Sequence, residues 1–225
     1  MVIYSDGAGL AQMKVYADDQ RVAGFTTNPS LMKSAGITNY RDFADAVLGI
    51  IGDKPVSFEV FSDDLIRMEA EAREIASWGD NVWVKIPIVN SSGASTGKVI
   101  RRLTEDGIKV NVTAVMTVLQ AALVLADILQ PESIISVFAG RIADTWVDPE
   151  PIVMACASLA RGRASVLWAS ARETLNVMQA DRAGAKIITL TPELIAKLHL
   201  RGRDLAKYSL ETVKQFHSDG MGISF

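Results

Sequence analysis

Short apolar runs alternate with longer segments of mixed polarity along the whole chain. Eight of these runs are rich in valine and isoleucine, which is typical of β-strands. They are VIYSD (2–6), VAGFT (22–26), VSFEV (56–60), VWVKIP (82–87), KVNVT (109–113), IISVF (134–138), SVLWAS (165–170) and KIITL (186–190). The pattern therefore predicts eight strands separated by other elements.

The segments between these runs have the spacing of apolar residues expected of amphipathic helices. Residues 63–79 place charged residues between regularly spaced apolar ones, residues 95–107 begin with a capping residue and end in glycine, and residues 117–131 end in proline. Strands that alternate with helices, without a linker rich in proline or serine, predict one (β/α)8 TIM barrel over residues 1–225. A doubly wound open sheet is the alternative.

A further helical pattern, residues 204–217, follows the eighth unit and leads into a glycine-spaced tail. Since eight β/α units complete a barrel, residues 204–225 form an additional C-terminal helix and tail. We expect this segment to pack on its own barrel or, as we prefer, on a neighbouring subunit.

One strand carries a lysine, Lys85, in the middle of the apolar run VWVKIP. Alternation along a strand places Lys85 on the same face as Trp83 and Pro87, among large side chains. Lysine is almost never fully buried unless a partner or a function requires it. Lys85 is therefore a candidate for a chemical role, although a lysine in a strand more often extends to solvent.

Other polar residues fall at or just after the ends of the predicted strands, where barrel enzymes build their active sites. Seven of the eight strands supply at least one of them: Asp6, Thr26, Thr27, Asn28, Glu59, Lys85, Asn111, Thr113, Ser136, Arg141, Ser170 and Arg172. Taken singly, a glutamate on a solvated face or a threonine and asparagine that cap a helix would explain each position equally well. Taken together, their matching places favour one site in the mouth of the barrel.

Composition narrows the choice of partners. The chain has 225 residues, a net charge of −3 and a pI of about 5.5, which disfavours nucleic acid or an anionic membrane as the main partner. Cys156 is the single cysteine, so neither an intrachain disulfide nor a cluster of thiolate metal ligands is expected. The first ten residues lack the pattern of a signal peptide and no apolar run has the length of a membrane span, so we expect a cytoplasmic protein.

Several stretches resemble the sequence motifs of the transaldolase family, in the family's order and over nearly the whole chain. They are Asp6, GFTTNPSL (24–31), SFEV with Glu59, VKIP with Lys85, VNVTAVMT (110–117), SVFAGRIAD (136–144) and VLWASARET (166–174). The short chain is similar to the compact branch related to fructose-6-phosphate aldolase.

The resemblance implies a role for each candidate residue. Lys85 would form a Schiff base with a ketose phosphate, Asp6 would take the proton of the donor hydroxyl, and Glu59 would relay protons through a water held by Thr113. The substrate-binding set would be Thr27, Asn28, Asn111, Ser136, Phe138, Arg141, Ser170 and Arg172, with Ser170 and the two arginines on the phosphate. No metal and no organic cofactor is implied, because the iminium serves as the electron sink.

The chain departs from the usual family pattern at a few positions. The family commonly has a small residue at Trp168, an aromatic one at Ala171 and proline at Val137, and Met116 also differs. We expect these changes to alter the walls of the acceptor and phosphate pockets. The acceptor preference could therefore differ from the family's usual four-carbon aldose phosphate.

Three functions are compatible with these residues. The first is a transferase that moves a dihydroxyacetone unit between sugar phosphates, in the pentose phosphate pathway or a specialised route. The second is a lyase that splits fructose 6-phosphate, and the third is a silent barrel that only binds sugar phosphates. Glu59 and Phe138 favour the transferase, because the resembled lyases have glutamine and tyrosine there. The resemblance also implies a homo-oligomer, a pentamer or decamer.

Overall fold

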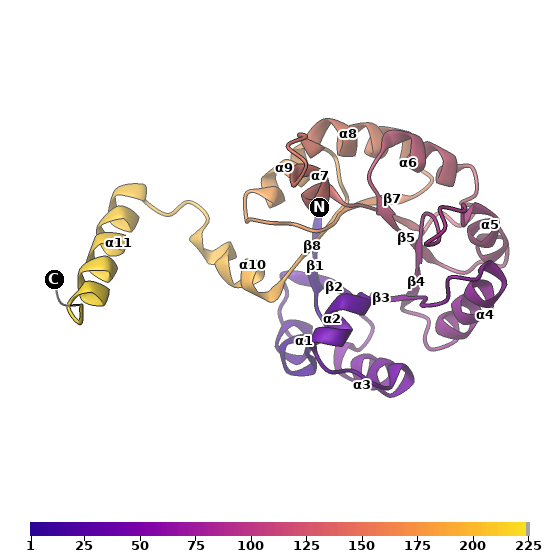
Figure 1. Cartoon of the computed structure of the whole chain (residues 1–225), viewed down its shortest axis with the longest axis horizontal. Coiled ribbons are helices and arrows are strands. Elements are labelled where there is room, and N and C mark those ends of the chain that lie inside the picture. Colours follow the sequence, from indigo (N-terminus) through magenta and orange to yellow (C-terminus); the bar gives the residue numbers. More distant parts are fainter. Residues whose placement is uncertain (224–225) are drawn as a thin grey trace. The chain divides into compact units, whose positions relative to one another are not determined.

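The computed structural model describes residues 1–223, so Ser224 and Phe225 of the predicted C-terminal tail lie outside the described residues. All strands are parallel and pair in chain order into a closed eight-stranded barrel, which confirms the predicted fold (Figure 1). The strands are β1 (Val2–Asp6), β2 (Val22–Thr26), β3 (Val56–Glu59), β4 (Val82–Pro87), β5 (Val110–Val115), β6 (Ile134–Val137), β7 (Ser165–Trp168) and β8 (Ile187–Leu190). Each lies within about two residues of the run that predicted it.

Helices surround the barrel and cover the outer face of the strands (Figure 1). The helices of the chain are α1 (Leu10–Ala17), α2 (Pro29–Ser34), α3 (Tyr40–Ile51), α4 (Leu65–Ala76), α5 (Gly97–Glu105), α6 (Val118–Leu125), α7 (Ala139–Ala143), α8 (Pro149–Ala160), α9 (Asn176–Arg182) and α10 (Pro192–Lys197), and after the barrel in the sequence a 3₁₀ turn (Leu198–Leu200) and α11 (Leu205–Gly220). Side-chain caps mark several starts: Asp64 accepts from the Arg67 backbone amide, and Thr117 forms a capping box with Gln120.

The register between strands fixes which side chains share the barrel interior. Glu59 pairs with Lys85, Lys85 with Asn111, and Pro87 with Thr113. The intervening valines and isoleucines of β3 to β5 are buried on the helix-facing side. The alternation read from the sequence therefore corresponds to the two faces of the barrel wall.

An apolar cluster fills part of the barrel and supports the polar residues at its mouth. It contains Tyr4, Ile134, Leu167, Ala169 and Ile187, with Ala23, Trp83 and Phe138 packed against it. Gly24 makes this packing possible, because a Cβ atom there would lie 2.7 Å from the Tyr4 ring. A close approach of this kind is a reason for glycine inside a strand.

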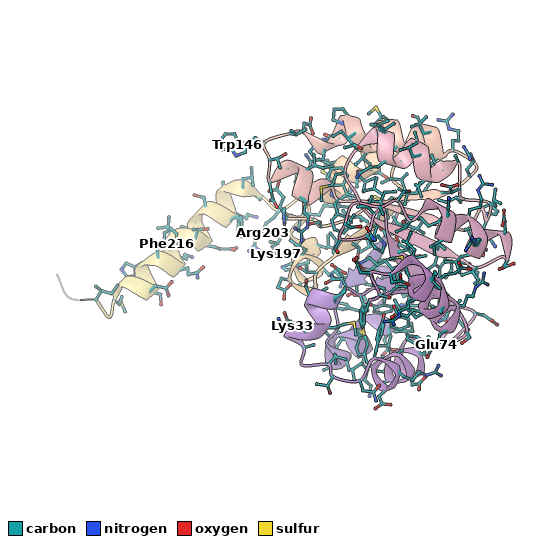
Figure 2. All side chains as sticks on the ribbon, turned by 45° about the vertical axis from the view of Figure 1, so that its right-hand side comes forward. Lys33, Glu74, Trp146, Lys197, Arg203 and Phe216 are labelled. Atoms are coloured by element: carbon teal, nitrogen blue, oxygen red, sulfur yellow. The ribbon has the colours of Figure 1, made fainter. Side chains whose placement is uncertain are left out.

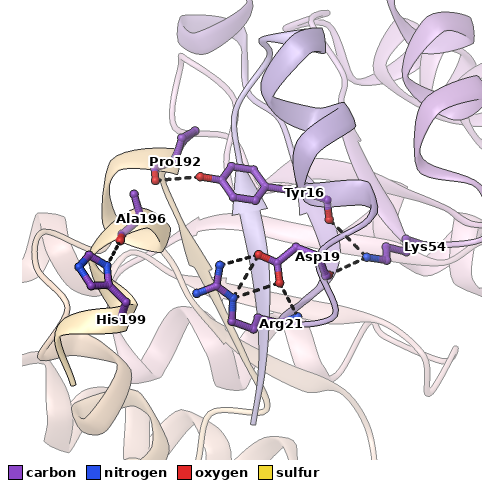
Figure 3. A network of polar contacts seen from close by, with 7 residues as sticks. All are labelled: Tyr16, Asp19, Arg21, Lys54, Pro192, Ala196 and His199. Carbon is purple, nitrogen blue, oxygen red and sulfur yellow. Dashed lines mark hydrogen bonds and ion pairs between the residues drawn. The ribbon is translucent and has the colours of Figure 1, made fainter. Parts of the chain in front are cut away.

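Polar contacts tie the connection between α1 and β2 to its neighbours (Figure 3). The Tyr16 hydroxyl donates to the Pro192 carbonyl at 3.0 Å, and the Lys54 ammonium donates to the carbonyls of Tyr16 and Asp19 at 3.3 and 3.1 Å. Asp19 also holds Arg21 in an ion pair of 2.6 Å. These contacts join the first, third and eighth β/α units at their ends.

The chain divides into two compact units, Met1–Ile195 and a second that begins at Ala196. The first holds the barrel. The second holds α11, as the helical pattern of the sequence predicted, and Asp204 caps it by accepting from the backbone amides of Ala206 and Lys207. Its apolar side chains, among them Phe216 (Figure 2), have no core to enter within this unit.

Within residues 1–223, no helix combines the length and apolar character needed to cross a bilayer.

Candidate active site

Lys85 lies inside the barrel on β4 and is 6 % exposed. Its Nζ atom is 3.0 Å from Oε2 of Glu59, which occupies the register position on β3, and it donates a hydrogen bond of 2.9 Å to the Thr27 carbonyl. The Glu59 carboxylate and the Thr27 carbonyl thus offset the cost of burying the Lys85 ammonium. The pair brings a candidate nucleophile into contact with a candidate proton acceptor.

Asp6 ends β1 and faces the same interior. Thr26 donates a hydrogen bond of 2.7 Å to its Oδ1 atom, and the Thr26 hydroxyl is 2.6 Å from that of Thr189 on β8. Burial raises the pKa of the Asp6 carboxyl above its ordinary value, while the charge of Lys85 and the hydrogen bond from Thr26 act against this rise. A carboxyl with a raised pKa can hold and release a proton closer to neutral pH, as a general acid or base requires.

Asn111 is fully buried on β5 and is oriented by two serines. Its Nδ2 atom donates to the Ser57 hydroxyl at 3.0 Å, and the Ser136 hydroxyl donates to its Oδ1 atom at 2.7 Å. These contacts fix which end of the amide is donor and which is acceptor. One N–H of the amide remains for a ligand in the barrel.

Thr113 lies two residues beyond Asn111 and is 2 % exposed. Its hydroxyl is buried without a hydrogen-bond partner in the described part of the chain. Buried hydroxyls in proteins are nearly always hydrogen-bonded, so an unpartnered one at the strand end of a barrel is suited to a water or a ligand.

The turn after β2 contributes both structure and polar groups. Thr27 donates from its hydroxyl to the Ser57 carbonyl at 3.0 Å, and its own carbonyl receives Lys85. Asn28 caps α2, because its Oδ1 atom accepts from the Leu31 amide at 3.0 Å. The helix-cap interpretation of this motif therefore holds for the Asn28 oxygen, and its amide nitrogen stays available to a ligand.

The predicted phosphate-binding residues lie in α7 and in the loop after β7, which approach each other closely. A Cβ atom on Gly140 would lie 1.6 Å from the Ser170 carbonyl and 3.2 Å from Nε of Arg172, so only glycine allows α7 to meet the loop after β7. Ser170 adopts a left-handed backbone with φ of 62°. Arg141 lies next to Gly140, with its guanidinium 6.0 Å from the centroid of the Phe138 ring.

Arg172 is held from two sides. Its backbone amide donates to Oδ1 of Asn176 at 2.8 Å, and its guanidinium forms an ion pair with Asp144 on the loop after α7. Arg172 and Asp144 are both about half exposed. The guanidinium therefore has one donor on a carboxylate and others facing solvent, where a phosphate could reach them.

Trp168 and Val137 do not line the mouth of the barrel, contrary to our expectation. The register pairs Val137 with Trp168, and Ser136 with Leu167. Because Ser136 and Leu167 face the interior, Val137 and Trp168 face the helices, where both are buried. Changes at these two positions therefore affect packing rather than the pocket walls.

Three residues with clear contacts to the site carry no role in the sequence interpretation. Thr26 and Thr189 orient Asp6, and Asp144 pairs with Arg172. Thr189 interrupts the apolar run KIITL as Lys85 interrupts its own run, and that pattern could have identified it. With Thr189, all eight strands and not seven supply a polar residue to this end of the barrel.

Cys156 lies in α8 and is buried, and burial raises the pKa of its thiol to about 11. A thiol with such a pKa is a poor nucleophile or metal ligand at neutral pH. Within residues 1–223, no group of three histidine, cysteine, aspartate or glutamate side chains has the arrangement to hold a metal ion.

A parallel barrel with a buried lysine and two carboxylates at the ends of its strands has the layout of (β/α)8 barrel proteins with a site at the C-terminal face. Residues 3–223 match the transaldolase/fructose-6-phosphate aldolase family, and the chain belongs to this family.

Relatives agree with this membership. The chain is 30 % identical over 201 residues to a "probable transaldolase" of Dehalococcoides mccartyi, with 88 % of this chain and 90 % of the relative covered. It is 34 % identical over 203 residues to a "probable transaldolase" of Streptococcus equi subsp. zooepidemicus, with the same coverage. A cube-shaped protein cage designed by fusing symmetric oligomeric domains is similar at a TM-score of 0.56, with 14 % identity, 98 % of this chain and 78 % of the other covered; it shares the fold alone.

Proposed function

We propose that this protein is a Schiff-base transaldolase, which transfers a dihydroxyacetone unit from a ketose phosphate to an aldose phosphate. The observation that carries the proposal is the buried Lys85 amine, 3.0 Å from the Glu59 carboxylate and near enough to Asp6 for their charges to interact. An amine nucleophile, a proton acceptor beside it and a second carboxyl with a raised pKa are the groups that this chemistry requires.

The first step joins Lys85 to the ketone of the donor. Transfer of a proton from the Lys85 ammonium to Glu59 leaves a neutral amine and a carboxylic acid. The amine attacks the carbonyl carbon to form a carbinolamine, and the acid returns a proton to the departing hydroxyl, which leaves as water. The unpartnered Thr113 hydroxyl supports this step, because it can hold the water close to Glu59.

The second step breaks a carbon–carbon bond. Asp6 takes the proton of the hydroxyl on C4 of the donor, the C3–C4 bond breaks, and its electron pair moves into the iminium to give an enamine. The aldehyde fragment leaves with the phosphate. Thr26 and Thr189 hold the Asp6 carboxyl in place for this transfer.

The third step returns the three-carbon unit to an acceptor. The enamine carbon attacks the aldehyde of an aldose phosphate, and Asp6 gives its proton to the new hydroxyl. Water then hydrolyses the iminium, and both of its protons end on the nitrogen; this releases the product ketose phosphate and restores the Lys85 ammonium beside the Glu59 carboxylate. Each proton that leaves a group returns to it over one cycle, so no cofactor takes part in this scheme.

The neighbouring polar residues supply binding contacts in this proposal. Asn111 and Ser136, already joined by a hydrogen bond, contact the hydroxyls of the three-carbon unit together with Thr27 and Asn28. Arg141, Ser170 and Arg172 bind the phosphate, and Phe138 forms part of the wall. The protein works on small sugar phosphates in the cytoplasm, as a homo-oligomer of five or ten chains, without nucleic acid or membrane.

Borohydride trapping tests the covalent step. Incubation with fructose 6-phosphate and sodium borohydride should reduce the iminium and add the mass of the bound fragment to the peptide that contains Lys85. Lys85→Met should lose both the label and turnover, and Lys54→Met, which removes another partly buried lysine, should retain the label. A label on a different lysine, or turnover by Lys85→Met, would refute the proposal.

A product assay separates transferase from lyase. Fructose 6-phosphate alone and fructose 6-phosphate with erythrose 4-phosphate should give different rates of glyceraldehyde 3-phosphate release. A transferase releases it faster when the acceptor is present, whereas a lyase is indifferent to the acceptor. Equal rates would show that the protein is a lyase of the same family rather than a transferase.

A further inference from the structure

A second concave site lies at the end of the barrel opposite the candidate active site. It lies between the C-terminal half of α8 and the C-terminal end of α9, beside the starts of β7 and β8. We call it the α8–α9 pocket. Its volume is about 570 Å³, within the range of small-molecule sites in proteins. Strand β7 begins in this pocket at Ser165 and ends just before the loop that carries Arg172.

Four cationic side chains line the α8–α9 pocket: Arg161, Arg163, Arg182 and Lys186. Arg182 is neutralised by Glu150, which it contacts with two hydrogen bonds of 3.0 and 2.9 Å. None of the other three has a carboxylate within 4.0 Å in the described part of the chain. The pocket thus keeps three uncompensated positive charges in a chain whose net charge is −3.

Most side-chain donors of the pocket have no acceptor in the described part of the chain. Arg163 gives one N–H to the Leu125 carbonyl at the end of α6 and keeps the rest of its guanidinium free. The hydroxyls of Ser158 and Ser165 make no hydrogen bond to the described residues. Two guanidinium groups, an ammonium and two hydroxyls therefore surround a space that offers a ligand donors and positive charge.

Capping of α8 explains only part of this arrangement. Arg161 follows the last residue of α8, where a cation is favoured by the helix dipole. Lys186 precedes a strand rather than ending a helix, and Arg163 lies two residues beyond Arg161, so the dipole of α8 does not account for them. Arg161, Arg163 and Lys186 are all exposed, so water screens their mutual repulsion and an anion from solvent can reach all three charges.

We propose that the α8–α9 pocket binds a small phosphorylated molecule with at least two negative charges, at a site separate from the catalytic one. Guanidinium groups match the oxygens of phosphate and of carboxylate with paired hydrogen bonds, and three cations balance two or more negative charges better than the single charge of a carboxylate. Apolar side chains beside the cations, Met154 and Pro131, suit the carbon part of such a molecule. This proposal does not depend on the transaldolase reaction, because the pocket shares no residue with the active site.

Calorimetric titration with inorganic pyrophosphate tests this site at physiological ionic strength. The wild type should bind at two sites, since the predicted phosphate-binding residues of the active site form the other. Arg161→Glu with Lys186→Glu should lose one binding event, with affinity there reduced about tenfold or more because each charge-assisted contact contributes to binding. Arg172→Ala should weaken the other event and leave the pocket unaffected.

A matched variant controls for overall charge. Lys14→Glu with Lys98→Glu changes the net charge equally at exposed lysines outside the pocket, and should keep both events. Equal losses in the two double variants, or no event sensitive to Arg161 and Lys186, would overturn the proposal. Arg161→Gln with Lys186→Gln repeats the test without introducing acidic residues, in case the reversed charges disturb folding. Turnover without added pyrophosphate should be unchanged in all three double variants.

Discussion

Lys85 and Glu59 occupy paired positions on adjacent strands of the barrel, and their charged atoms are 3.0 Å apart. The exposed fractions of these side chains are 7 % and 16 %, so water screens the pair only weakly. A pair of this kind is both a structural element and a ready proton donor and acceptor. Experiments can separate the contribution of the pair to folding stability from its contribution to proton transfer.

We expect coupled effects on stability when the pair is removed. Lys85→Met and Glu59→Gln should each lower the free energy of unfolding, by about 3 kcal/mol if the remaining charge stays buried and unpaired. The double variant should lose less than the sum, because neither charge is then left alone. Urea unfolding at pH 7 measures all three. Additive losses would show that the two side chains do not depend on each other.

Asp6→Asn should abolish turnover and yet stabilise the fold at neutral pH. Because burial raises the folded-state pKa of Asp6, this carboxyl favours the folded state only below its unfolded pKa, and that contribution is lost as pH rises through the folded pKa. Asparagine removes the buried charge and still accepts from Thr26. The gain over wild type should therefore be largest at pH 7 and vanish in acid, as measured by thermal unfolding at several pH values.

Asp63→Asn provides a control of opposite sign. Hydrogen bonds from Ser91 lower the pKa of Asp63, so its contribution to stability is present above the unfolded pKa and is lost as pH falls through the folded pKa. Asp63→Asn should destabilise at neutral pH and converge with wild type in acid. If Asp6→Asn also destabilises the fold at neutral pH, as Asp63→Asn should, burial does not raise the pKa of the Asp6 carboxyl.

Arg172→Ala should weaken phosphorylated donors selectively. The loss of a charge-assisted contact costs about 1.5–3 kcal/mol, so KM for fructose 6-phosphate should rise by about one to two orders of magnitude. KM for dihydroxyacetone, which has no phosphate, should change little. Arg101→Ala is a matched control, since Arg101 is also about half exposed and paired with an aspartate. Equal changes for both donors would exclude a phosphate role for Arg172.

Phe138→Tyr should shift the enzyme from transfer toward cleavage. Phe138 packs beside the apolar cluster of the barrel and offers no hydrogen bond to water. A tyrosine hydroxyl there could orient water to protonate the enamine and hydrolyse the iminium. Release of glyceraldehyde 3-phosphate without acceptor should rise and the ratio of transfer to cleavage should fall, and Phe138→Leu should not have this effect. An unchanged ratio in Phe138→Tyr would contradict the role of this position.

Removal of α11 should disrupt the assembly. Leu210, Val213 and Phe216 are exposed apolar residues of a helix that has no core within its own unit. We expect them to pack on a neighbouring subunit, so a chain ending at Arg203 should give smaller particles in multi-angle light scattering. Leu210→Lys with Phe216→Lys should act in the same direction, whereas Lys207→Ala should not. Full-size particles from the truncated chain would place the subunit contact elsewhere.

The sequence by itself determined the fold, and it predicted most residues of the candidate site. Eight runs of valine and isoleucine at intervals matching a β/α unit favoured a closed parallel barrel over a doubly wound open sheet. Alternation with a period of two then identified the interior face, because a strand buried on both sides can carry Lys85 or Asn111 only where other polar groups compensate it. Composition and alternation are properties of each strand's own sequence, so they can be read without the folded structure.

Only the tertiary structure decided which side chains of the site contact one another. Thr26 contacts both Asp6 and Thr189 because closure of the barrel brings the first, second and eighth strands together, and no pattern within one strand contains that information. Alternation also fails past the strand ends, where Ser170 takes a positive φ and Gly140 allows α7 to touch the loop after β7. Pairing between strands and loop conformation depend on contacts distant in sequence, which is why the Asp144–Arg172 pair and the outward position of Trp168 required the folded chain.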